Sequence, residues 1–194
     1  MQQIDDRETK KILEELHDAL ARGVLGDVVE LGCYKGDTSV ELARILKTTD
    51  KKLFLYDSFE GLPEKTEEDS CSLGESFKSG ELLARKNEVF KRFLHLSLPR
   101  PIIKKAWFNE LEKSDLPDKI AFALLDGDFY ESIKDSFNLI ENKLSDGATV
   151  IVDDYSNPAL PGAKQATDEW FAKYKTQNKN AQIQRFGVLA IIKT

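Results

Sequence analysis

Residues 28–39 decide the fold, and they read Val28-Val29-Glu30-Leu31-Gly32-Cys33-Tyr34-Lys35-Gly36-Asp37-Thr38-Ser39. The short apolar run at the start, followed at once by Gly32, is typical of a buried parallel strand that ends in a tight turn. Gly36 gives the loop a second point at which backbone can approach a ligand. From Thr38 onward apolar residues recur with helical spacing, and Thr38 and Glu41 match a capping box. The stretch predicts a strand, a glycine-containing loop and a helix.

Two kinds of nucleotide ligand compete for this loop. A dinucleotide site needs G-x-G-x-x-G, but Tyr34 stands where the second glycine would fall and would obstruct a pyrophosphate. An acidic residue two positions before the first glycine suits a ligand with positive charge, such as S-adenosylmethionine, and Glu30 has that place. The alternative is that Glu30 forms a salt bridge or a cap at the sheet edge, since charged residues rarely lie in apolar runs without a partner.

Composition narrows the class of protein. The chain has 194 residues, of which 41% are hydrophobic, enough for one domain with a sizeable core. Its net charge is −6 with acids and bases interleaved, so we expect no nucleic-acid partner. No apolar run reaches the length of a membrane span, and no export signal precedes the first helix. With Cys33 and Cys71 as the two cysteines, we expect a reduced, cytoplasmic protein without a membrane partner, and a homo-oligomer is compatible with this pattern.

The rest of the chain predicts an α/β fold. We expect helices over residues 5–22 and 81–93, and further helices after Gly127 and Gly162. The expected strands cover residues 28–31, 52–56, 102–103, 120–125, 148–152, 183–186 and 188–192, the last of them antiparallel. Asp57 ends the second strand, where a carboxylate can accept hydrogen bonds from ribose hydroxyls, although it could also be a turn residue. Phe59 would then cover an adenine ring.

Residues 61–80 form an acidic and polar stretch that contains several serines and glycines. Such a stretch predicts a mobile surface segment. Long loops at the carboxyl ends of strands border the ligand crevice in this class of fold. The segment is therefore expected to be either a lid over the acceptor site or a disordered insertion.

Acidic residues follow two of the buried strands. Asp126 and Asp128 come after residues 120–125, and Asp153 and Asp154 come after residues 148–152. Ligands bind at the carboxyl ends of strands in open α/β sheets. Several acids gathered there without a cation would repel one another, so we expect a divalent ion, and oxygen ligands favour magnesium, manganese or calcium.

Four ordered motifs together resemble the macrocin O-methyltransferase (TylF/MycF) family over about residues 26–172. They are Glu30-Leu31-Gly32 with Tyr34 to Ser39, Asp57-Ser58-Phe59-Glu60-Gly61-Leu62-Pro63, Leu125-Asp126-Gly127-Asp128-Phe129-Tyr130-Glu131-Ser132, and Val152-Asp153-Asp154-Tyr155. The resemblance implies a single Rossmann-like class I methyltransferase domain, residues 1–194, with a seven-stranded, mostly parallel sheet and helices on both faces. Its members carry longer N-terminal segments that help to close the acceptor site, so the resemblance leaves the acceptor class and the degree of closure undecided for this chain.

The resemblance also implies an activity and a set of residues. The expected activity is O-methylation of a small-molecule hydroxyl, such as a sugar or vicinal diol of a natural product. The expected cofactors are S-adenosylmethionine and a divalent cation, Mg²⁺. Asp126, Asp153 and Asp154 match the metal-binding acids, Asp128 matches a proposed base, and Trp107 lies in a region that borders the adenine. The expected cofactor residues are Glu30, Gly32, Tyr34, Gly36, Thr38, Ser39, Asp57, Ser58, Phe59, Trp107 and Asp126. A nicotinamide-dependent oxidoreductase and a non-catalytic S-adenosylmethionine-binding module are the alternatives.

Overall fold

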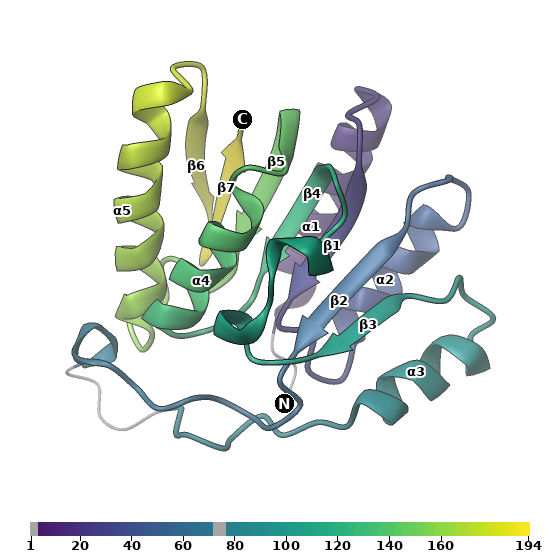
Figure 1. Ribbon diagram of the computed structural model, residues 1–194, viewed down its shortest axis with the longest axis horizontal. Coiled ribbons are helices and arrows are strands. Elements are labelled where there is room, and N and C mark those ends of the chain that lie inside the picture. Colours follow the sequence, from purple (N-terminus) through teal and green to yellow (C-terminus); the bar gives the residue numbers. More distant parts are fainter. Residues whose placement is uncertain (1–3, 72–76) are drawn as a thin grey trace.

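A computed structural model of the protein describes residues 4–71 and 77–194. It contains one seven-stranded sheet with the order β3-β2-β1-β4-β5-β7-β6 (Figure 1). β7 is antiparallel to both of its neighbours, and the strands from β3 to β5 pair in parallel. The predicted α/β fold, with its antiparallel last strand, is confirmed.

The strands and helices alternate along most of the chain. The strands are β1 (Asp27–Leu31), β2 (Leu53–Asp57), β3 (Ile102–Lys105), β4 (Ile120–Leu125), β5 (Leu144–Val152), β6 (Gln182–Phe186) and β7 (Leu189–Lys193). The helices are α1 (Asp6–Ala21), α2 (Asp37–Leu46), α3 (Lys86–His95), α4 (Tyr130–Ile140) and α5 (Pro161–Gln177), with short 3-10 turns η1 (Glu67–Asp69), η2 (Phe108–Glu110) and η3 (Lys113–Asp115). Within the described ranges, none of the helices combines the length and apolarity that a membrane crossing requires.

The core lies in two layers because successive strand residues point to opposite faces of the sheet. Val29 packs in the layer that α4 and α5 cover, whereas its neighbour Val28 packs in the layer that α1, α2 and α3 cover. Figure 1 shows the helices that cover the two faces of the sheet. Since both faces are covered, the central strands are apolar at nearly every position, as the sequence of β4 shows.

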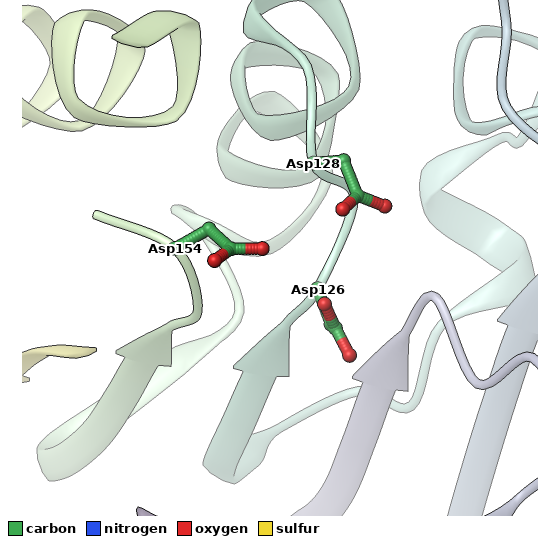
Figure 2. A group of neighbouring side chains, drawn as sticks. All are labelled: Asp126, Asp128 and Asp154. Atoms are coloured by element: carbon green, nitrogen blue, oxygen red, sulfur yellow. The ribbon is translucent and has the colours of Figure 1, made fainter. Parts of the chain in front are cut away.

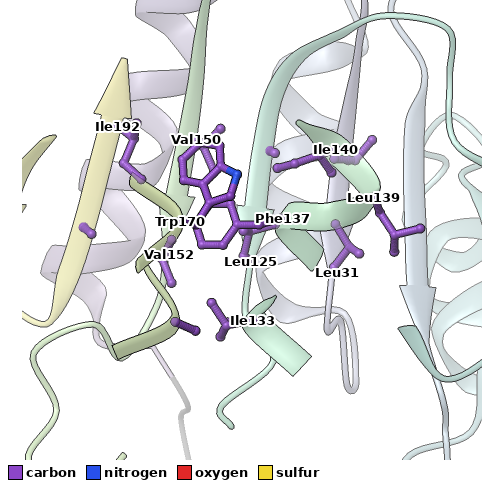
Figure 3. Close-up of a cluster of buried hydrophobic side chains, with 14 of the residues drawn as sticks. Leu31, Leu125, Ile133, Phe137, Leu139, Ile140, Val150, Val152, Trp170 and Ile192 are labelled. Atoms are coloured by element: carbon purple, nitrogen blue, oxygen red, sulfur yellow. The ribbon is translucent and has the colours of Figure 1, made fainter. Parts of the chain in front are cut away.

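An aromatic stack closes the layer under α4 and α5. The rings of Phe137 and Trp170 lie 4.1 Å apart and nearly parallel, at 10° (Figure 3). On its other side Trp170 stacks on Tyr174 at 4.5 Å, and its indole N–H donates to Glu141 at 3.2 Å. The stack joins the two helices to each other directly.

The helix predicted over residues 81–93 begins later, at Lys86, so the prediction for its first turn was wrong. Leu82 has a left-handed φ of 61°. The backbone before it is used in a turn instead, because Leu62 donates to the Glu81 carbonyl at 2.8 Å and Gly80 donates to the Leu62 carbonyl at 2.9 Å. Leu83 is exposed, so the apolar spacing of this segment did not mark a buried face.

The segment predicted to be mobile is anchored at its described start. Asp69 is buried, and one of its oxygens accepts from the Tyr130 backbone N–H at 2.8 Å. Its other oxygen accepts from the backbone and the hydroxyl of Thr66. Residues 72–76 lie outside the described part of the chain, so the expected lid over residues 61–80 stays a prediction.

Replacing Trp170 with alanine should destabilise the protein by about 3–5 kcal/mol, because the change removes a stacked, buried ring from between two helices. Urea unfolding measures the difference in the free energy of unfolding. Leu94→Ala is the control, since Leu94 lies on α3 with 55% of its surface exposed, and should change stability by less than about 0.5 kcal/mol. Similar losses in both variants would contradict this account of the core.

Candidate active site

The site is built at the carboxyl ends of β1, β4 and β5, where the loops after the strands lie against one another. Asp126 donates its backbone N–H to the Leu31 carbonyl at 2.8 Å, and Asp153 donates to the Leu125 carbonyl at 2.9 Å. Each hydrogen bond extends the parallel ladder one step past the strand. The residues that follow the three strands are therefore held in fixed register.

Gly32 allows the closest approach in this region. Its φ is +94°, and a Cβ atom there would lie 1.9 Å from the backbone oxygen of Asp126. No other residue type can fill this position without moving one of the two loops. The glycine that was predicted to end the first strand is thus required because the backbone after the fourth strand passes so close to it.

Asp57 holds the backbone of the glycine loop in place through hydrogen bonds. Its Oδ2 accepts from the backbone N–H groups of Cys33 at 2.9 Å and Tyr34 at 2.8 Å, and its Oδ1 accepts from Phe59 at 2.6 Å. Burial raises the pKa of Asp57, and these three hydrogen bonds oppose that effect. A carboxylate has about four acceptor positions, so one remains for a ligand hydroxyl. The bond to Phe59 is the local turn contact that the sequence left open as an alternative, whereas the two bonds to the glycine loop were not predicted, because Cys33 and Tyr34 are distant in the sequence.

Glu30 is buried, with 2% of its surface exposed, and accepts from the Ser39 hydroxyl at 2.5 Å. Burial raises its pKa to about 8, and the charge of Asp57 contributes to the rise. Within residues 4–71 and 77–194 the structure gives Glu30 no ion pair, which disfavours the salt-bridge alternative. The predicted capping box was wrong: α2 begins after Gly36, at φ +78° and without a side-chain cap, and Ser39 turns inward to Glu30 instead.

Two cavities adjoin this loop, and Asp126 lines both. The first has a volume of about 460 Å³, and the second about 600 Å³. Of the predicted residues, the first cavity contains Gly32, Tyr34, Asp57, Ser58, Trp107, Asp126 and Asp128. The second contains Glu30, Thr38 and Asp126. Neither cavity is lined by the remaining predicted residues, which are Gly36, Ser39, Phe59, Asp153 and Asp154, and the side chains of Ser39, Phe59 and Asp153 are buried.

Sequence reasoning missed part of the first cavity's wall. Its far side contains Glu131, Ser132 and Asp135 from α4, together with Asn109 and Glu110 from η2. Glu131 and Asp135 are four residues apart at the start of the helix that follows Asp126 and Asp128, so they share one face. That spacing was the signal that could have identified them.

Three carboxylates meet above the strand ends. Oxygens of Asp126, Asp128 and Asp154 all lie within 4.8 Å of one another. Figure 2 shows Asp128 and Asp154 approaching from neighbouring strand ends beside Asp126. Asp128 and Asp154 both have left-handed backbone angles, with φ of 61° and 56°. Such angles are uncommon outside glycine and tend to occur at functional sites.

The structure does not include Asp153 in this group, although the sequence predicted it as a metal ligand in place of Asp128. Asp153 is buried, and its Oδ1 has no hydrogen-bond partner within the described part of the chain. Burial raises the pKa of Asp153 and of Asp126 well above the usual range, and neighbouring aspartates add to the effect. Burial and the charge of Asp154 raise the pKa of Asp128 to about 8.

The raised pKa of Glu30 predicts a pH-dependent stability. Between the ordinary pKa of 4.5 and the folded value of about 8, the folded protein holds a proton that the unfolded chain releases, so stability falls as pH rises. Glu30→Gln removes this group's share of the fall, which is on the order of a few kcal/mol. Denaturation of the ligand-free protein at pH 5, 6.5 and 8 measures it. Parallel profiles for the two proteins would contradict the assignment.

Comparison with known proteins identifies relatives of the chain. The family described as Macrocin-O-methyltransferase (TylF) matches over residues 2–190. Demethyldecarbamoylnovobiocin O-methyltransferase from Streptomyces niveus is 29% identical, over 92% of this chain and 71% of the relative. Mycinamicin III 3''-O-methyltransferase from Micromonospora griseorubida is 26% identical, over 89% of this chain and 71% of the relative.

Solved structures agree with the sequence relatives. The structure of the O-methyltransferase NovP has a TM-score of 0.80 at 25% identity and covers 96% of this chain and 78% of its own. CalS11, a calicheamicin methyltransferase, shares the fold with a TM-score of 0.74 at 20% identity, over 98% of this chain and 80% of its own. These matches favour the methyltransferase over the oxidoreductase and the non-catalytic module. The chain belongs to the TylF macrocin O-methyltransferase family and is an S-adenosylmethionine-dependent O-methyltransferase.

Proposed function

We propose that the protein methylates a hydroxyl of a sugar carried by a natural product, and that a divalent cation bound at the aspartate cluster assists the transfer. The observation that supports a cation is that carboxylate oxygens of Asp126, Asp128 and Asp154 lie within 4.8 Å of one another. The acceptor class is supported by the names of the relatives, one of which acts on mycinamicin III and another on demethyldecarbamoylnovobiocin.

The residues at the cluster fit a cation. All of the donor atoms are carboxylate oxygens, which suit magnesium, manganese or calcium. Burial raises the pKa of all three acids. Neighbouring aspartates raise the pKa of Asp126 and Asp128 further, and Glu8 raises that of Asp154, so a positive charge would relieve an unfavourable arrangement. The unpartnered Oδ1 of Asp153 is a further buried oxygen that a cation or its water could satisfy.

Two of the three aspartate ligands of the proposed cation follow from both the sequence and the structure, and two residues are candidates for the third. Asp126 and Asp154 belong both to the set predicted from the sequence and to the set that the structure brings together. Asp128 and Asp153 compete for the third place. If Asp153 is the ligand, Asp128 is free to act as the base that its position in the sequence motif suggested.

The chain's own residues would divide the work of methyl transfer. Glu30 would face the positively charged end of the cofactor, and Asp57 would hold the glycine loop and the ribose. A bound divalent cation would lower the pKa of the acceptor hydroxyl by polarising its oxygen. If Asp153 is the third ligand, the carboxylate of Asp128 would take the hydroxyl proton. What remains is the alignment of the methyl group with the acceptor oxygen, which the fixed register of the strand ends supports.

Asp57→Ala should weaken binding of S-adenosylhomocysteine by about 1.5–3 kcal/mol in calorimetry, because a charged hydrogen-bond acceptor is lost. Hydrogen exchange at Cys33 and Tyr34 should also accelerate, since both amides donate to this carboxylate. Asp50→Ala is the control, because Asp50 is exposed in the turn between α2 and β2. Unchanged affinity would remove Asp57 from the cofactor site.

Asp128→Asn and Asp153→Asn should separate the ligand from the base. The ligand variant should lose Mn²⁺ affinity in calorimetry by about 10-fold or more, whereas the base variant should keep it and lose turnover by about 100-fold or more. A chelator should abolish turnover of the unmodified enzyme, and Mg²⁺ should restore it. Asp118→Asn, at the opposite end of β4, is the matched control. Full turnover in excess chelator would eliminate the cation from the mechanism.

A further inference from the structure

Glu8 is a buried carboxylate that the reaction described above does not use. It lies in the first turn of α1, which Asp5 caps by accepting from the Glu8 backbone N–H at 2.7 Å. An acid in this turn interacts favourably with the helix dipole, but that effect does not require burial, and Asp6 in the same turn is exposed. Glu8 has only 8% of its surface exposed, so a more specific contact must offset the loss of its hydration.

The contact is with the turn between β6 and β7. Oε1 of Glu8 accepts from the Val188 backbone N–H at 2.7 Å, across 180 residues of sequence. Gly187, beside it, has a φ of +59°, and a Cβ atom there would lie 2.2 Å from the same oxygen. The turn is therefore shaped to receive this carboxylate, and a hydrogen bond to a charged acceptor is among the stronger kinds.

Val188 also forms a hydrogen bond to the loop that follows β5 and contains Asp154. Its carbonyl accepts from the Ser156 backbone N–H at 3.0 Å, so the two backbone groups of one residue join α1 to the loop after β5. The next residue, Asn157, donates its side-chain amide to Oδ1 of Asp154 at 2.8 Å. A movement of Ser156 would thus carry with it a direct partner of an aspartate in the cluster.

Glu8 also lies close enough to act on the cluster through its charge. Burial raises the pKa of both Asp153 and Asp154, and the Glu8 carboxylate raises each further. The hydrogen-bonded connection from Glu8 to Ser156 does not depend on this charge. A substitution that keeps the acceptor oxygen and removes the charge therefore separates the two effects.

We propose that Glu8 is a positioning residue of the aspartate cluster, because it fixes the Gly187–Val188 turn and, through Ser156 and Asn157, the backbone and side chain of Asp154. The inference rests on the proposed function in so far as it concerns cation binding. The hydrogen-bonded connection from Glu8 to Ser156 is independent of that function.

Two substitutions at Glu8 test the proposal. Glu8→Ala removes the acceptor, whereas Glu8→Gln keeps an oxygen that can accept from Val188 and removes the charge. Hydrogen exchange at Val188 and Ser156 should accelerate about 10-fold in Glu8→Ala and stay near the unmodified rate in Glu8→Gln. Calorimetry with Mn²⁺ alone should show about a 10-fold loss of affinity in Glu8→Ala and restoration in Glu8→Gln. Glu14→Ala, an exposed acid on the same helix, is the matched control and should change neither quantity.

Each outcome has a distinct meaning. Unchanged exchange at Ser156 in Glu8→Ala would overturn the proposal, as would an unchanged affinity for Mn²⁺. If Glu8→Gln loses Mn²⁺ as Glu8→Ala does while its amides stay protected, charge and not positioning explains Glu8, and the proposal is again overturned. If the unmodified protein binds no Mn²⁺, the cation of the proposed function fails. The exchange rates in Glu8→Ala would then still decide whether Glu8 holds the turn. If Glu8→Ala does not fold, Glu8→Asp replaces it, because the shorter side chain keeps the charge but withdraws the acceptor oxygen from the Val188 N–H, and unchanged exchange at Val188 and Ser156 in that variant would overturn the proposal.

Discussion

The close approach of the loops after β1 and β4 is the constraint on which the site depends. Gly32 and the backbone oxygen of Asp126 leave no space for a Cβ atom between them. This contact brings the glycine loop and the acidic loop to one point, and Asp126 lines both cavities. A parallel sheet makes such a meeting possible because neighbouring strands end at the same edge. The chemistry of the site therefore begins with a backbone contact and not with a side chain.

The centre of the sheet was predictable from the sequence because β1, β2 and β4 are short, mostly apolar runs that end at glycine or aspartate. Burial on both faces makes β4 an uninterrupted apolar run, and its short length together with the aspartate and glycine that follow it distinguish it from a buried helix. The start of α3 was not predictable in the same way. Its apparent first turn has helical apolar spacing, but the backbone near Gly80 and Glu81 bonds to Leu62, which is distant in the sequence. Local periodicity contains no information about such a partner.

The candidate site was predicted to the level of the loops but not of every side chain. Asp57 and Glu30 were identified by their positions at strand ends. Their partners, the amides of the glycine loop and the Ser39 hydroxyl, depend on how the loop folds over them. The sequence also did not show that Asp128, and not Asp153, would lie in the aspartate cluster. The direction of each side chain depends on backbone angles in the loops, such as the left-handed φ of Asp128 and of Asp154.

The antiparallel direction of β7 has a consequence for how the chain leaves the domain. β6 runs toward the carboxyl edge of the sheet, and β7 returns from it, so that Thr194 bonds to Gly147 and Ala148 at the start of β5. The site and the last residue of the sequence thus lie at opposite edges of the sheet (Figure 1). A tether, an affinity tag or a fused partner joined after Thr194 would emerge away from the two cavities, which makes this end the suitable one for attaching the enzyme to a surface.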